Sequence, residues 1–169
     1  MSQIARPNST IDNAGWAVIG APTHHEAVDD EIRDDDASYI KCVEGNGLIK
    51  LGLSEVEEPR VRSSPDHIFT MWARAIGSGK GESLDGWLYQ GETLIKQLYS
   101  KKAMPRIDYS FDIRSVLGGE EAELITDYSA LEVHFAYNII GAGEEIRITL
   151  MELEVPDPKT YKGPVMMII

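Results

Sequence analysis

The sequence predicts an all-β protein whose antiparallel strands form a sandwich or barrel, with short helical turns between some of them. Residues 106–113 and 131–139 each alternate apolar and polar side chains without a break. Successive side chains of a strand point to opposite faces of a sheet, so each run predicts a strand with one buried face. The chain repeats this pattern in eight or nine short runs separated by turn residues, and it contains no long helical period. This combination is typical of sandwiches and barrels.

The first part of the chain predicts an arm followed by short strands. Residues 1–13 are polar and show no apolar period, so we expect an extended N-terminal arm. The segment 24–36 is polar and acidic and predicts a loop, and 44–47 is rich in turn residues and predicts a hairpin. The strands expected in this part cover 16–19, 38–43, 48–53 and 67–76.

The rest of the chain predicts hairpins, one connection with helical turns, and a long last strand. The strands expected here cover 84–90, 93–99, 106–113, 131–139 and 145–155. One or two helical turns are expected within 117–124. In the last strand the apolar positions change from even to odd numbers at Leu150–Met151, which predicts a β-bulge or a strand that bends between two sheets.

These elements predict one sandwich domain over residues 14–156, between the N-terminal arm and a C-terminal tail, 157–169. Pro156 and Pro158 end the last strand of that domain. The period of two also predicts which side chains face the core. They are Ile107, Tyr109, Phe111, Ile113, Leu131, Val133, Phe135, Tyr137 and Ile139. Glu132 and His134 are expected on the opposite, solvent-facing side of their strand.

Composition limits the classes of function. Hydrophobic residues make up 43% of the 169, enough for a core. The 28 acidic and 16 basic residues give a net charge of −12, which argues against nucleic acid or an anionic membrane as partner. The single cysteine, Cys42, excludes an internal disulfide and is expected to be a small buried residue. We expect no signal peptide, since the N-terminus lacks an apolar h-region. We expect no membrane helix, since no apolar run approaches about 20 residues.

Three segments resemble ligand-binding motifs but lack essential residues. Residues 77–80 (GSGK) resemble a phosphate-binding loop, but Gly81 stands where such a loop needs Ser or Thr. Residues 25–29 (HEAVD) resemble the zinc motif H-E-x-x-H, but Asp29 stands at the second ligand position and the other histidines, His67 and His134, lie on strands far along the chain. The acidic run 29–36 fails the EF-hand spacing, which leaves only a weak calcium site as an alternative to a solvated loop. No metal and no cofactor are therefore expected.

No catalytic residue is predicted. Nothing in the sequence selects one pair among the 28 acidic residues for glycoside hydrolysis, and no G-x-S-x-G nucleophile elbow occurs. Cys42 lies in the middle of an expected strand, where no helix N-terminus lowers its pKa. We therefore expect a protein that is not an enzyme.

Several turn and strand phrases between Arg6 and Pro156 suggest a known family. They are RPNST at 6–10 with Gly15–Trp16, DDDASYI at 34–40, ITDYS at 125–129 leading into LEVHF at 131–135, and the strand 148–155 with ELEVP at 152–156. This order resembles small β-sandwich virion proteins of tailed bacteriophages and prophages. The resemblance implies a jelly-roll-like sandwich on the outside of a virus particle. It implies a capsid cement or decoration protein, with a tail component as the second possibility.

As a virion protein, the chain would be assembled in the bacterial cytoplasm and would bind the major capsid protein and copies of itself on the outer capsid surface. The expected contact residues lie at the two ends of the chain and are Arg6, Pro7, Val165, Met166, Met167, Ile168 and Ile169. The apolar end of the tail would promote aggregation if it were exposed to water, so we expect it to be buried. Strand addition to a neighbouring subunit or packing in the chain's own sandwich would provide it.

The sequence is also compatible with two other functions. Trp72, Trp87 and Tyr89 could form a sugar-stacking platform, as in a carbohydrate-binding module or a receptor-binding tail domain, with core packing or a protein interface as the alternative. A β-sandwich hydrolase would need two convergent carboxylates in a cleft.

Overall fold

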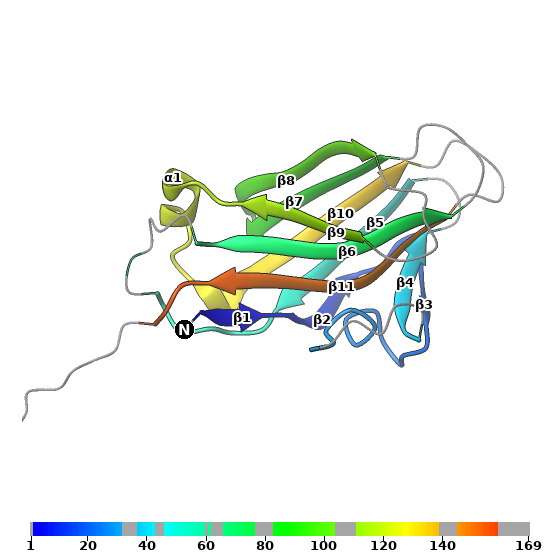
Figure 1. Cartoon of the computed structure of the whole chain (residues 1–169), viewed down its shortest axis with the longest axis horizontal. Helices are drawn as coiled ribbons and strands as arrows, with labels where there is room; N and C mark the ends of the chain where they lie inside the picture. The colour runs from blue at the N-terminus through cyan, green and yellow to red at the C-terminus, as the bar shows by residue number, and fades with distance from the viewer. Residues whose placement is uncertain are drawn as a thin grey trace, which may run out of the picture.

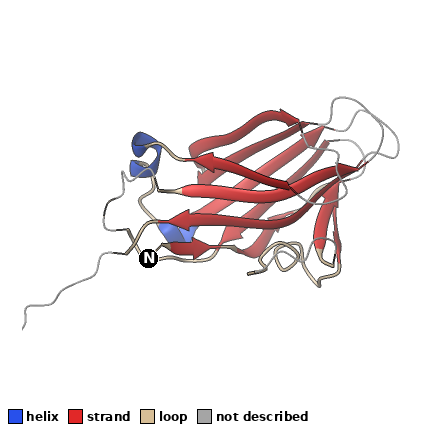
Figure 2. Cartoon of the chain, in the orientation of Figure 1, coloured by secondary structure: helices blue, strands red, loops and turns tan. Residues whose placement is uncertain are grey.

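The computed structural model describes residues 2–31, 37–42, 46–59, 61, 66–76, 83–103, 111–138 and 145–158. The described strands are β1 (Gln3–Ala5), β2 (Pro7–Asp12), β3 (Trp16–Ile19), β4 (Tyr39–Cys42), β5 (Asn46–Leu53), β6 (Ile68–Ile76), β7 (Ser83–Gln90), β8 (Thr93–Ala103), β9 (Phe111–Val116), β10 (Leu131–Asn138) and β11 (Glu145–Val155). The helical elements are α1 (Gly119–Glu123) and the 3₁₀ turn η1 (Tyr128–Ala130). Both lie at one end of the molecule (Figure 2).

The strands form two antiparallel sheets packed face to face (Figure 1). One has the order β3-β4-β11-β6-β9, with β1 also paired to β11, and we call it the β11 sheet. The other has the order β2-β5-β10-β7-β8, and we call it the β10 sheet. From β4 onward the strands pair first with last: β4 with β11, β5 with β10, β6 with β9 and β7 with β8. This nested pairing is the arrangement of a jelly roll, so the predicted fold class is confirmed.

The N-terminal segment 1–13 does not form the predicted arm. Residues 3–5 pair with the end of β11, and residues 7–12 pair with β5 at the edge of the β10 sheet. The apolar period is missing because Ala5 and Pro7 are the buried positions here while most of the other side chains are partly or fully exposed. Pro7 can start β2 because an edge strand tolerates the missing N–H donor. The prediction of an arm over 1–13 was therefore wrong.

The core lies between the two sheets, as the period of two predicts. Ile113, Leu131, Val133, Phe135 and Tyr137 are buried, whereas Glu132 and His134 lie on the outer side of β10. Ile107, Tyr109, Ile139 and the side chain of Phe111 lie outside the described residues.

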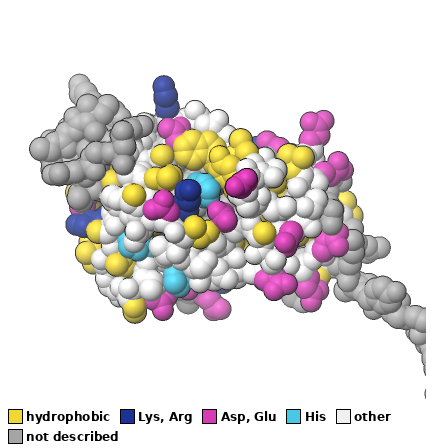
Figure 3. Space-filling model, turned by 180° about the vertical axis from the view of Figure 1, so that it is seen from behind, with side chains coloured by type: hydrophobic (Ala, Val, Ile, Leu, Met, Phe, Trp, Pro, Cys, Tyr) yellow, Lys and Arg dark blue, Asp and Glu magenta, His cyan; other side chains and the backbone are white. Residues whose placement is uncertain are grey.

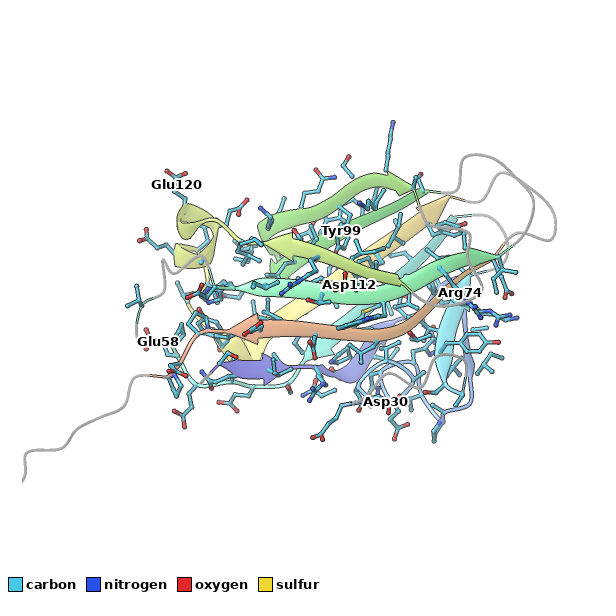
Figure 4. All side chains as sticks on the ribbon, in the orientation of Figure 1. Asp30, Glu58, Arg74, Tyr99, Asp112 and Glu120 are labelled. Carbon is cyan, nitrogen blue, oxygen red and sulfur yellow. The ribbon has the colours of Figure 1, made fainter. Side chains whose placement is uncertain are left out.

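An aromatic cluster joins the sheets. The ring centroid of Phe69 from the β11 sheet lies 6.0 Å from that of Phe135 and 6.4 Å from that of Tyr99, both in the β10 sheet. The Tyr99 hydroxyl donates to the carbonyl of Ile113 across the core (2.9 Å; Tyr99 is labelled in Figure 4). Burial raises the pKa of the Tyr99 phenol, and the nearby charge of Asp112 adds to the effect.

A β-bulge accounts for the change from even-numbered to odd-numbered apolar positions in the last strand. Ile148 pairs with Ala73 and Leu150 pairs with Trp72, so Thr149 is the extra residue. The bulge lies next to the predicted position. It keeps both Ile148 and Met151 in the core, because the extra residue reverses the order of inward and outward side chains. The predicted helical turns within 117–124 are also present, as α1.

Candidate binding face

The three aromatic residues predicted as one platform lie on opposite faces of the sandwich. Trp72 is on the outer side of β6 in the β11 sheet, between the buried residues Met71 and Ala73. Trp87 and Tyr89 are on the outer side of β7 in the β10 sheet. Because β6 and β7 belong to different sheets, Trp72 cannot contribute to a surface shared with the other two.

Trp87 and Tyr89 instead join a histidine from the neighbouring strand. In the register of β7 with β10, Trp87 lies opposite His134 and Tyr89 lies opposite Glu132. The rings of Tyr89 and His134 stack, with centroids 4.4 Å apart and an interplanar angle of 23°. Nε2–H of His134 donates to Glu132 Oε2 (2.8 Å), which fixes the orientation of the imidazole. We call Trp87, Tyr89 and His134 the aromatic platform.

Groups of different character surround the aromatic platform. Lys50 lies opposite His134 on β5, and Gln97 lies opposite Trp87 on β8. Leu94, opposite Tyr89, is 47% exposed. Figure 3 shows this side of the molecule, where hydrophobic side chains gather around a histidine and charged groups of both signs border them. The face therefore offers apolar contact area together with hydrogen-bonding groups.

A hollow of about 400 Å³ opens beside the aromatic platform. Strands β2, β5 and β10 and the turn η1 surround it, and its lining residues are Asn8, Ser9, Ile11, Gly52, Leu53, Glu55, Ser129, Ala130, Leu131 and Glu132. A Cβ atom on Gly52 would come within 2.4 Å of Ser9 Oγ, so the glycine leaves room at this point. Glu132 belongs to both regions, because it lines the hollow and binds His134.

Gln90 fixes the wall of the hollow that η1 provides. Its side-chain oxygen accepts from the backbone N–H groups of Thr126 (2.8 Å) and Asp127 (2.9 Å), and its amide donates to the Thr126 hydroxyl (2.9 Å). Asp127 caps η1 by accepting from the N–H and the hydroxyl of Ser129. These hydrogen bonds hold the pKa of the Asp127 carboxyl below its usual value. The wall is thus tied to β7 directly after Tyr89.

The zinc-like and calcium-like segments form no metal cluster within the part of the chain that the structure describes. His25 Nδ1 lies 3.1 Å from the hydroxyls of both Thr10 and Thr23, and the Thr23 hydroxyl donates to Glu26 (2.7 Å). Burial, followed by the charge of Asp30, raises the pKa of Asp29. Residues 32–36 and the glycine-rich segment 77–81 lie outside the described residues, so the absence of a calcium site stays a prediction.

The predicted partner-binding residues at the N-terminus lie within the protein's own fold. The guanidinium of Arg6 pairs with Glu152 (Nη2 to Oε2, 3.4 Å), and its backbone exchanges hydrogen bonds with Ser54. Pro7 is buried. The placement of these two residues on an extended arm was therefore wrong, and their contact with a partner protein stays a prediction.

The predicted partner-binding residues at the C-terminus, 165–169, lie outside the described residues. Binding to a capsid protein and location in a virion stay predictions. Among the described residues, none of the helices has the length and apolar character needed to cross a membrane.

No family model matches the chain, and no curated protein matches it. Among solved structures, TmCBM61 in complex with beta-1,4-galactotriose has a TM-score of 0.43 at 9% identity, covering 90% of this chain and 86% of that one. An apo form cyclase from Fischerella sp. has a TM-score of 0.43 at 12% identity, covering 94% and 84%. The K3 cleaved adhesin domain of Lys-gingipain from Porphyromonas gingivalis has a TM-score of 0.39 at 9% identity, covering 88% and 99%. TM-scores this low decide nothing about function, which must be derived from the chain's own residues.

Proposed function

We propose that this protein is a carbohydrate-binding β-sandwich module that holds a glycan on the outer face of the β10 sheet. The observation that supports this function best is the aromatic platform beside a polar hollow. A sugar ring has apolar C–H faces and a polar rim. It therefore needs an aromatic surface beneath it and hydrogen-bonding groups around it, and small-molecule sites commonly combine apolar lining with a few placed polar groups.

The aromatic platform supplies the apolar contact. Trp87 and Tyr89 are two residues apart on one strand, so both rings stand on the same side of the sheet. His134 packs against Tyr89 and is itself held by Glu132, which limits the rotation of both rings. A platform built on paired central strands loses little conformational freedom when a ligand binds, and such preorganisation favours affinity.

The surrounding polar side chains can orient the sugar through hydrogen bonds. Lys50 and Gln97 lie on either side of the row formed by His134 and Trp87. Both can donate hydrogen bonds to sugar hydroxyls, and the amide oxygen of Gln97 can accept one. No covalent bond has to be formed or broken for such binding.

The test compares aromatic residues on the two outer faces. Trp87→Ala and Tyr89→Ala should each weaken binding to soluble polysaccharides by tenfold or more, because stacked aromatic residues dominate such interfaces, and a tenfold loss corresponds to about 1.4 kcal/mol. Trp72→Ala is the matched control, since Trp72 is also half-buried but lies on the β11 sheet. Affinity electrophoresis against a panel of polysaccharides, followed by calorimetry on the best ligand, measures the effect. An equal loss in all three variants, or none in Trp87→Ala and Tyr89→Ala, would contradict the proposal.

A further inference from the structure

We infer that the hollow beside the aromatic platform is a subsite for an uncharged sugar unit and that it rejects acidic sugars. This inference rests on the proposed function and specifies its substrate class. It follows from the charge of the lining, from the hydrogen-bonding groups of the lining and from the connection between the hollow and the platform.

The residues that line the hollow carry a net negative charge. Its charged members are Glu55 and Glu132, and its ten residues include no Lys, Arg or His. A uronic or sialic acid placed there would bring a third carboxylate close to two others, and the lining itself contains no cation to balance it. Like charges at short range repel, and the net charge of −12 increases the repulsion. The hollow thus disfavours anionic sugars.

The other polar groups of the lining suit neutral hydroxyls. The Asn8 amide and the Ser9 hydroxyl can each donate or accept a hydrogen bond. The Ser129 hydroxyl donates to Asp127 and can still accept one. Ionised Glu55 and Glu132 can accept from sugar hydroxyls, which are donors as well as acceptors. Ile11, 50% exposed, adds an apolar contact at the β2 side. A volume of about 400 Å³ lies within the usual range of small-molecule sites.

The hollow and the aromatic platform form one surface. Glu132 lies opposite Tyr89 in the sheet register, binds His134, and lines the hollow. The wall formed by η1 is tied to Gln90, the residue after Tyr89. A glycan stacked on Tyr89 can therefore continue into the hollow without leaving the protein surface. The ligand is then an oligosaccharide whose unit in the hollow carries no carboxylate or sulfate.

The experiment uses two polymers with the same backbone, hydroxyethyl cellulose and carboxymethyl cellulose, together with xylan, galactan and mannan and their uronic-acid-substituted forms. In affinity gels at low salt, the full chain should be retarded by a neutral polymer and much less by its acidic counterpart. Glu55→Lys should raise the affinity for the acidic counterpart by roughly tenfold, because it exchanges one repulsive charge for an attractive one. Asp112→Lys is the matched control, since it makes the same change of charge on the β11 sheet (Figure 4).

The possible outcomes separate the inference from the proposed function. Equal binding of a neutral polymer and its acidic counterpart keeps the proposed function and overturns the inference. An equal gain in Asp112→Lys and Glu55→Lys also overturns it, because the effect then comes from the net charge and not from the hollow. Failure to bind any glycan overturns both. Selective binding of the neutral polymer, with a gain confined to Glu55→Lys, supports both.

Discussion

Gly86 shows how closely single residues fit in the core of this sandwich. A Cβ atom at this position of β7 would lie 2.6 Å from Phe135 Cε1 and 2.9 Å from Tyr99 Cδ2, inside the aromatic cluster that joins the sheets. Gly86→Ala should therefore destabilise the protein by roughly 1–3 kcal/mol through overpacking. Urea denaturation measures the loss. Gly118→Ala is the control, since its Cβ would meet only Glu121 Oε2 at 3.4 Å. An unchanged midpoint in Gly86→Ala would show that the cluster can move aside.

Phe135 tests the same cluster by removing volume. The residue is fully buried and contacts both Phe69 and Tyr99. Phe135→Ala should cost about 3–5 kcal/mol, because it removes the transfer free energy of the ring and leaves a cavity between the sheets. Thermal or urea denaturation monitored by circular dichroism gives the value. Leu94→Ala, at an exposed position of β8, should change stability by about 0.5 kcal/mol or less. Similar values for both variants would contradict the predicted core.

At the scale of the strands, the sequence predicts where the strands lie better than it predicts which strands pair with one another. The period of two identifies β10 and its buried side, because each of its residues has a buried or solvent-facing environment in turn. The change of apolar positions from even to odd numbers at Leu150–Met151 likewise predicts the bulge that the pairing of β11 with β6 shows. Pairing between distant strands leaves no such local pattern. His134 was predicted on the polar side of its strand, but only the sheet order places it beside Trp87 and Tyr89.

The same limit explains the errors. Trp72 was predicted to share a platform with Trp87 and Tyr89, yet consecutive strands of a jelly roll can belong to opposite sheets. Residues 3–12 looked like an arm because two short edge strands bury few side chains. The hollow could not be predicted at all, since its lining comes from three separate segments of the chain.

The contact between α1 and β8 gives a pH-dependent contribution to stability. Lys96 Nζ donates to the Glu121 carboxylate at 2.6 Å. Burial alone would raise the pKa of Glu121, but the hydrogen bonds from Lys96 and from the Gly118 N–H outweigh it and hold the pKa below its usual value of 4.5. Because the carboxylate is favoured in the folded state, this contribution is present above the unfolded pKa and is lost as the pH falls through the folded pKa.

Lys96→Met removes this contact and tests its pH dependence. The variant should lose about 0.2–1 kcal/mol at neutral pH, the usual value for an ion pair at the protein surface. The difference from the natural sequence should shrink towards zero at acid pH, where Glu121 is protonated in both the folded and the unfolded state. Urea titrations of both proteins across the acid range measure it. Lys102→Met, at an exposed position of the same strand, is the control. A difference that stays constant with pH would mean that Lys96 acts through packing of its alkyl chain.

At the scale of the whole molecule, removal of the C-terminal tail distinguishes the two proposed functions, which are glycan binding and virion cement. The described strand pairs all lie between Gln3 and Val155 and form two sheets with a continuous core. The aromatic platform and the hollow lie within the same range. A chain without Val165 to Ile169 should therefore fold cooperatively and bind glycans as the full chain does. Its melting temperature should stay within about 2–4 °C of the full chain, the shift that about 1 kcal/mol causes in a domain of this size.

The virion-cement prediction gives a different result for the same truncation. If the apolar tail binds a neighbouring subunit, its removal should abolish self-association in analytical ultracentrifugation and binding to assembled capsids, while the sandwich stays folded. Trp87→Ala is the reciprocal variant, because it should lose glycan binding and keep any association through the tail. A truncated chain that no longer folds would place the tail in the core. A truncated chain that keeps its assembly state would exclude the tail as a subunit contact and leave the outer face of the β10 sheet as the one proposed binding surface.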